Sequence, residues 1–246
     1  MTIEMYNNYS KLQSAGINKD VKCKSLIDYF NELKELKHEG VLLYRGHSNY
    51  DYDLIPSIGR LSNGHHIYTL EDEKQMFIEF KKNYSLFTDN RPTTDIDILF
   101  LAQHFGVPTR LLDWSYNPLI ALYFACQGDD KVNGCVYAII VPKEESMIKE
   151  GHWYDFRIFD KDSYQHDYEY IIPDYNNRRF LNQKGMFVLY KDPFSPIEKS
   201  ALAPVFIIKN KKQILEELYS IGITDSMVLP TLDNLGKEIA NKYKRI

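Results

Sequence analysis

Apolar residues recur at helical spacing in several separate stretches of the chain, most of them in its first half. The first stretch places five apolar side chains on one helical face: Leu26, Ile27, Phe30, Leu33 and Leu36. Ser25 and Asp28 are typical of an N-terminal capping pair for this helix. The same spacing predicts helices over residues 70–84, 95–105 and 211–221, and another that begins after Pro230. Asn117 followed by Pro118 predicts a further helix that ends near residue 126.

Continuous apolar runs predict buried strands over residues 41–44, 135–141, 186–190 and 205–208. Gly46 is expected to break the first strand, residues 109–116 are expected to be irregular, and a short strand is expected near residues 156–159. Helices therefore concentrate in the first half and strands in the second, which predicts an α+β fold. We expect a single mixed domain, with the helices packed on a central, largely antiparallel sheet. Residues 1–20 are expected to form an irregular arm and residues 21–246 the domain.

Composition and charge exclude several classes of protein. With 44% hydrophobic and 26% charged residues over 246 positions, the chain is globular rather than disordered. The formal net charge of −4 lacks the basic excess that is typical of nucleic-acid binders. The three cysteines, Cys23, Cys126 and Cys135, have no CxxC spacing, which argues against a disulfide framework and fits a reducing compartment. With no apolar signal core and no run near the ~20 residues of a membrane helix, the expected location is the cytoplasm, without a membrane partner.

The first segment rich in functional groups is Tyr44-Arg45-Gly46-His47, at the end of a predicted buried strand. A buried Arg costs free energy unless it meets an anion or a carboxylate. Gly46 allows a sharp turn or the close approach of a ligand. Two interpretations remain open. Arg45 either binds a phosphate or carboxylate through its planar guanidinium, or forms an internal ion pair with Asp113.

The second segment, residues 102–115, places several functional side chains around one turn, just before the predicted helix start at Asn117. These side chains are His104, Arg110, Asp113, Trp114 and Ser115. A helix N-terminus favours an anion, and Trp114 can stack on a planar ring. In the alternative, structural interpretation, Asp113 pairs with Arg110, Trp114 lies in the core and His104 caps a helix. We expect residues 109–115 to be ordered and mostly buried, and Arg45 to share a cleft with Asp113.

Other groups of polar residues carry less information. His65 and His66 are adjacent, so in an extended chain they point to opposite faces and are interpreted as part of a solvated loop. No metal site is expected, because the remaining histidines and acids lack the spacing of metal ligands. The sequence also lacks GxSxG, P-loop and GxGxxG motifs. Glu71, Glu73 and Lys74 are interpreted as the solvated start of a helix.

Taken together, these motifs resemble the FRG-domain family. The resemblance is carried by YRGHS and LIPSIGR in residues 44–60 and by AQHFGVPTRLLDWSYNPLIALYFAC in residues 102–126. Residues 182–187 resemble the family's Gln-x-Gly-x-Phe element, and residues 218–233 resemble its C-terminal Leu-Gly-Ile and Pro-x-Leu-Asp element. The resemblance covers roughly residues 24–240. Members of this family occur in bacterial and phage proteins.

A remoter similarity connects the same motifs to the ADP-ribosyltransferase superfamily. Tyr44-Arg45-Gly46 matches the strand that carries an Arg in those enzymes, and residues 113–115 with the helix over 121–125 match a second element. This similarity implies an ADP-ribosyltransferase-like fold, NAD as the substrate, a protein or nucleic-acid acceptor, and a role as a toxin or phage-defence effector. The implied catalytic residues are Arg45, Asp113 and Gln183. The implied NAD-binding residues are Tyr44, Arg45, Gly46, His104, Arg110, Trp114 and Ser115.

One departure from the superfamily pattern keeps other functions open. Gln183 stands where the superfamily usually has a catalytic Glu, and the next glutamate along the chain is Glu198. A non-enzymatic domain that binds a nucleotide or nucleic acid through the same Arg45 and Trp114 cleft is the main alternative. A nuclease or other hydrolase is a third possibility, although the sequence offers no set of metal ligands for it.

Overall fold

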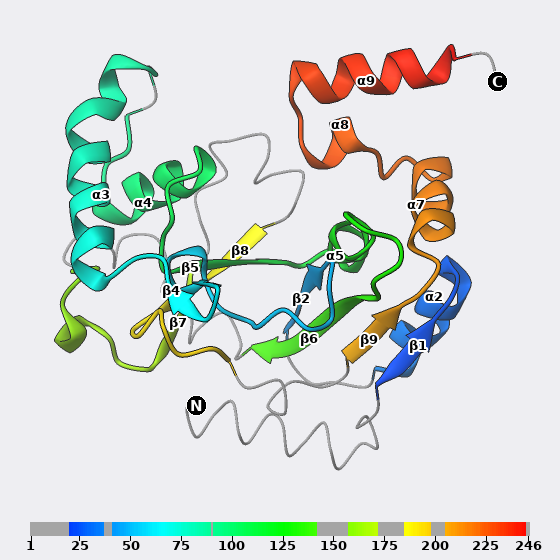
Figure 1. Ribbon diagram of the computed structural model, residues 1–246, viewed down its shortest axis with the longest axis horizontal. Helices are drawn as coiled ribbons and strands as arrows, with labels where there is room; N and C mark the ends of the chain where they lie inside the picture. The colour runs from blue at the N-terminus through cyan, green and yellow to red at the C-terminus, as the bar shows by residue number, and fades with distance from the viewer. Residues whose placement is uncertain are drawn as a thin grey trace.

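The computed structural model describes residues 20–36, 41–89, 91–141, 157–171, 185–197 and 205–244. A sheet with the strand order β1-β9-β6-β2-β5-β8-β7 forms the centre of the molecule (Figure 1). Its strands are β1 Val21–Cys23, β2 Val41–His47, β5 Leu111–Ser115, β6 Gly134–Val141, β7 Tyr168–Ile171, β8 Gly185–Tyr190 and β9 Val205–Ile208. Strand β1 runs parallel to β9, and every other neighbouring pair in this sheet is antiparallel. Strands β3 (Leu61–Ser62) and β4 (His65–His66) form a separate hairpin.

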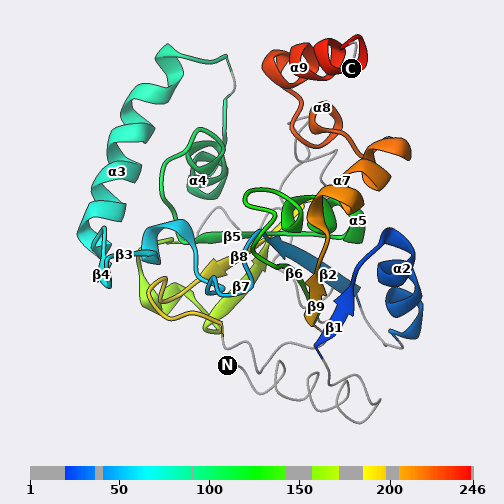
Figure 2. The ribbon, with the colours of Figure 1, turned by 45° about the vertical axis from the view of Figure 1, so that its right-hand side comes forward.

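The helices lie in two groups with one helix between them. They are α2 Leu26–Glu35, α3 Leu70–Asn83, α4 Asp95–His104, α5 Pro118–Ala125, α7 Lys211–Ser220, α8 Asp225–Val228 and α9 Leu232–Lys242. Helices α3 and α4 lie at one end of the sheet, α2 and α7–α9 lie toward the other, and α5 lies between the two groups (Figures 1 and 2). This arrangement confirms the expected single α+β domain with a largely antiparallel sheet. No helix in the described part of the chain combines the length and the apolar composition that crossing a bilayer requires.

The predicted helices form where spacing and capping residues coincide. The Ser25 side chain accepts a hydrogen bond from the Asp28 amide, and Asn117 caps α5 directly before Pro118, as the sequence predicts. Thr94 and Asp97 make a reciprocal capping box at the start of α4. Each cap satisfies amide groups that would otherwise lack a partner, which fixes the residue at which the helix begins.

Two segments near the predicted site differ from expectation. Strand β2 does not stop at Gly46 but continues to His47. Here glycine is required by packing, because a Cβ at Gly46 would lie 1.8 Å from the Ala121 carbonyl oxygen of α5. Residues 111–115, expected to be irregular, form β5, in which Asp113 is exposed and its neighbours are buried. The expected burial of residues 109–115 is confirmed for every position except Asp113.

The sequence also misses two short strands at the edges of the sheet. Strand β1 has three residues and obtains its hydrogen bonds from β9, far away in the chain. Strand β7 contains Glu169, which is buried and accepts bonds from the amides of Gln165 and His166. The strand expected near residues 156–159 is not formed by the described residues 157–159, which lie in a turn. Residues 1–19 of the expected arm lie outside the described residues.

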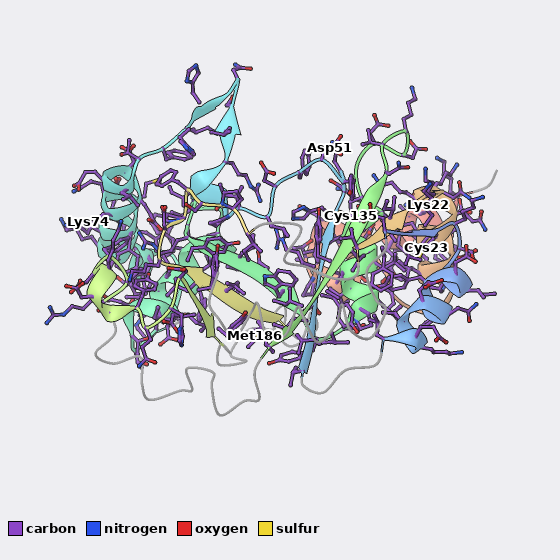
Figure 3. The ribbon with its side chains drawn as sticks, turned by 90° about the horizontal axis from the view of Figure 1, so that it is seen from below. Lys22, Cys23, Asp51, Lys74, Cys135 and Met186 are labelled. Atoms are coloured by element: carbon purple, nitrogen blue, oxygen red, sulfur yellow. The ribbon has the colours of Figure 1, made fainter. Side chains whose placement is uncertain are left out.

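Apolar side chains fill both faces of the sheet. Successive residues of β2 point to opposite faces, so Leu43 joins one core cluster and Tyr44 joins another. The Tyr44 cluster includes residues of α2, α5 and α7, whereas α3 and α4 pack with β5, β7 and β8 in a third cluster. Figure 3 shows Cys23 beside α2 at one end of the molecule, Lys74 at the other, and Met186 of β8 between them.

The buried thiols provide a test of this packing. Burial raises the pKa values of Cys23 and Cys126 from about 9 to about 12. Because burial favours the neutral thiols, their contribution to stability is complete below pH 9 and is lost as the pH rises toward 12. We therefore expect iodoacetamide at pH 9 to alkylate the folded protein far more slowly than the urea-unfolded protein, measured by intact mass spectrometry. Equal rates in the two states would contradict the packing.

Candidate functional site

The candidate site lies where β2 and β5 separate within the sheet. The register between these strands consists of the pair Tyr44 and Ser115, although each strand pairs along its full length with its other neighbour. Beyond that pair, the Arg45 guanidinium lies between the strands, and its Nη1 donates to the Asp113 carbonyl oxygen at 2.5 Å. A side chain therefore bridges the strands where backbone pairing ends.

A pocket with a volume of about 170 Å³ opens at this separation. Residues of β2, β5 and α5 line it: Tyr44, Arg45, Gly46, Asp113, Trp114, Ser115, Ile120, Ala121 and Phe124. The expectation that Arg45 and Asp113 share a cleft is confirmed. Pockets that hold whole small molecules usually measure roughly 300–1,000 Å³. This pocket therefore has room for one ring or one phosphate group of a larger ligand.

Arg45 is a partly desolvated cation with spare hydrogen-bonding capacity. Its side chain is 13% exposed, its Nε donates to His47 Nε2 at 3.0 Å, and its Nη1 is 3.9 Å from the Asp113 Oδ2 atom. Among the described residues, Nη2 has no hydrogen-bond partner. Burial lowers the pKa of Arg45, the Asp113 carboxylate opposes that shift, and the positive charge of Arg60 adds to it. An anion in the pocket would compensate this charge better than the distant carboxylate does.

Asp113 is exposed but held in a fixed orientation. Gln103 Nε2 donates to Asp113 Oδ1 at 2.9 Å, and Gln103 Oε1 accepts a hydrogen bond from the Thr109 hydroxyl. The Thr109 amide donates to Ser57 Oγ at 3.0 Å, which links the site to the segment after β2. Sequence reasoning missed Gln103. The sequence feature that could have identified it is its position, because Gln103 is a polar residue directly after Ile98–Ala102, which are all buried in α4.

Two aromatic side chains line the pocket from neighbouring strands. Burial raises the pKa of Tyr44 to about 12, so its phenol is neutral at physiological pH. Trp114 is almost fully buried, and its indole N–H has no acceptor within the described part of the chain. Buried indole N–H groups usually find a partner, so an indole donor without one is unusual. Ser115 Oγ accepts from the Asn117 amide and so supports the start of α5.

Arg110 belongs to a different structure from Arg45. Its guanidinium contacts Glu73 of α3, with Nη2 2.6 Å from Oε2 and Nε 3.0 Å from Oε1. The alternative in which Asp113 pairs with Arg110 is therefore wrong, and so is the interpretation of Glu73 as a solvated residue. Arg110 does not line the pocket. Its position ties the start of β5 to α3, which holds the Asp113 segment in place.

The remaining predicted residues have different places. His104 is the last residue of α4 and packs edge-on against Phe105 at 4.9 Å between ring centroids. It is not among the lining residues of the pocket. Gly46 lines the pocket, but the close approach of α5 is what requires a residue without a side chain at this position. Gln183 lies outside the described residues.

The fold and the site define an α+β domain with an arginine-containing pocket between two separating strands. Residues 40–134 match the family model of the FRG domain, and this range includes every lining residue of the pocket. The chain therefore contains an FRG domain. No curated protein and no solved structure gives a significant match to the chain.

Proposed function

We propose that the pocket binds NAD and that the protein transfers ADP-ribose from it to a protein or nucleic-acid acceptor. The observation that carries this proposal is the Arg45 guanidinium, which lines the pocket beside Tyr44 and Trp114 and whose Nη2 has no hydrogen-bond partner among the described residues. A guanidinium is suited to a phosphate, and aromatic faces are suited to a planar ring. A dinucleotide supplies both groups, and most of it would lie outside a pocket of about 170 Å³.

The proposed reaction needs few groups from the protein. The bond between ribose C1′ and the nicotinamide nitrogen breaks, and nicotinamide leaves with the electron pair. The cationic C1′ then forms a bond to the acceptor nucleophile, which loses a proton. Arg45 would hold a phosphate, Trp114 or Tyr44 would face the ring, and a carboxylate would stabilise the cation. The role proposed for Gln183, orienting a ribose hydroxyl, follows from the superfamily resemblance alone.

Asp113 has the properties that the cationic step requires. Its side chain is 55% exposed, so a substrate can reach it. Gln103 holds Oδ1, whereas Oδ2 accepts no hydrogen bond from the described residues. A carboxylate oriented before the reaction stabilises developing positive charge without having to reorganise.

A non-enzymatic nucleotide-binding domain is the second candidate. The lining residues include no glutamate, and Asp113 is the one carboxylate among them. The same Arg45 and aromatic side chains would then bind a nucleotide without breaking it. The two candidates differ in a simple observable, because only the transferase releases nicotinamide.

The test measures binding and turnover in parallel. Full-length protein is incubated with NAD labelled in its nicotinamide ring, with and without cell lysate, and free nicotinamide is quantified, while calorimetry measures NAD binding. Arg157→Ala is a matched control, because this arginine side chain is 78% exposed and does not line the pocket. Release that Arg45→Ala removes and Arg157→Ala preserves supports the transferase. Binding without release supports the second candidate, and the absence of both rejects the transferase and excludes NAD as the ligand of the pocket.

A further inference from the structure

His47 lies beside Arg45 on the same face of β2. Residues two apart on a strand share a face, and the Arg45 Nε to His47 Nε2 distance is 3.0 Å. His47 is only 7% exposed, and its ring packs edge-on against Tyr137 at 5.3 Å and Tyr52 at 6.4 Å between ring centroids. The imidazole is therefore held in place by packing that does not depend on Arg45.

The hydrogen bond from Arg45 determines which nitrogen of the His47 imidazole carries a proton. An arginine side chain only donates hydrogen bonds, so His47 Nε2 must be the acceptor. The neutral ring then carries its proton on Nδ1. A protonated ring would have no lone pair for Arg45 and would place a second positive charge against the guanidinium.

The contact also decides which edge of Arg45 a ligand can use. A guanidinium offers one edge through Nε and Nη2 and another through Nη1 and Nη2. His47 occupies Nε, and the Asp113 carbonyl oxygen occupies part of Nη1. Because Nε and Nη1 both form hydrogen bonds, the guanidinium is held in one plane. The hydrogens of Nη2, together with the second hydrogen of Nη1, remain for an anion.

We propose that His47 is a positioning residue that holds Arg45 for a phosphate of NAD. This inference rests on the proposed function, and the same geometry would serve inorganic pyrophosphate. A long side chain that is already ordered loses less conformational entropy when it binds its ligand. Loss of the acceptor is therefore expected to weaken binding by about 3- to 10-fold, without removing the cation itself.

Three substitutions of His47 distinguish the effect of its hydrogen-bond acceptor from the effect of its ring shape. His47→Phe keeps a ring against Tyr137 but removes the acceptor. His47→Gln places an amide oxygen near the position of Nε2, whereas His47→Asn has the same amide on a side chain one carbon shorter. Thermal melting of each variant checks that the sheet remains folded.

Three readouts are made on full-length protein. The first is hydrogen exchange of the Arg45 Nε–H in ¹⁵N NMR spectra, assigned with Arg45→Lys. The second is affinity for inorganic pyrophosphate, and the third is KM and kcat for nicotinamide release. We expect faster exchange, about 3- to 10-fold weaker binding and a raised KM in His47→Phe and His47→Asn, with substantial recovery in His47→Gln. A structural role alone would not make Gln better than Asn.

The outcomes distinguish this inference from the proposed function. If all three variants retain nicotinamide release and pyrophosphate affinity, the positioning role of His47 is overturned, and the proposed transferase is unaffected. If pyrophosphate affinity falls in His47→Phe and His47→Asn and recovers in His47→Gln, but no protein releases nicotinamide, the transferase is rejected and the positioning role is supported. A His47→Gln protein as impaired as His47→Phe would also overturn the positioning role. Wild-type protein that binds neither pyrophosphate nor NAD would reject both.

Discussion

Arg45→Ala is expected to lower NAD turnover by roughly 30- to 1,000-fold while the protein remains folded. In the proposed reaction, the variant loses a charge-assisted phosphate contact worth about 2–4 kcal/mol in the transition state. The side chain also donates to His47 and to the Asp113 carbonyl oxygen, and each such bond contributes about 0.5–1.5 kcal/mol to stability. We therefore expect only a modest decrease in the melting temperature.

Arg45→Lys is the informative companion to this variant. Lysine restores the positive charge but not the planar group that can contact His47, Asp113 and a phosphate at once. Partial recovery of turnover is therefore expected. Turnover and thermal melting are measured side by side, with Arg157→Ala as the control for loss of a surface arginine. Unchanged turnover in folded Arg45→Ala would reject the catalytic assignment, and a protein that unfolds many degrees earlier would show that Arg45 is structural.

The helices and the main strands could be predicted because their signals are local. Spacing of apolar residues and capping side chains such as Ser25 and Asn117 lie within the segments that they organise. Strand β5 was missed because its polar Asp113 interrupts the apolar run, and its hydrogen bonds come from β8 and β2. The continuation of β2 through Gly46 likewise depends on α5, whose approach no local pattern reveals.

The pairing of charged residues was the least predictable feature. Arg45 and Arg110 are the same residue type in comparable settings, yet one lines the pocket and the other is buried against Glu73. Lys211 is another example, since it is buried and donates to the carbonyl oxygens of Ser48 and Asp129, while its neighbour Lys212 is exposed. Sequence gives the number of charges in a segment, but only the tertiary fold decides which one faces inward.

The proximity of Arg45 and Asp113 was predictable for a different reason. A buried cation restricts its own surroundings, because it needs an acceptor or a negative charge. Asp113 was the strongest candidate within the second segment, and the structure brings the two together through the carbonyl oxygen and, at 3.9 Å, the carboxylate. Gln103 and His47, which form hydrogen bonds with Asp113 and Arg45, carry no comparable constraint in the sequence.

Glu73→Ala is expected to destabilise the protein by about 3–5 kcal/mol, because it leaves the Arg110 charge buried without its carboxylate. The Arg110 and Glu73 side chains are only 4% and 1% exposed. The carbonyl oxygen of Ile158 and the hydroxyl of Tyr164 remain as partners for Arg110, but neither is negatively charged at neutral pH. Urea denaturation measures the change in the free energy of unfolding.

Two further variants make this prediction specific to the ion pair. Glu71→Ala removes an exposed carboxylate from the same helix turn and is expected to change stability by no more than about 0.5 kcal/mol. The double variant Glu73→Leu with Arg110→Met removes both charges, and replacing a buried pair by apolar groups is often close to neutral. We therefore expect the double variant to be more stable than Glu73→Ala alone. A Glu73→Ala protein as stable as Glu71→Ala would show that Arg110 does not depend on this carboxylate, and that the support it gives to β5 comes from its other contacts.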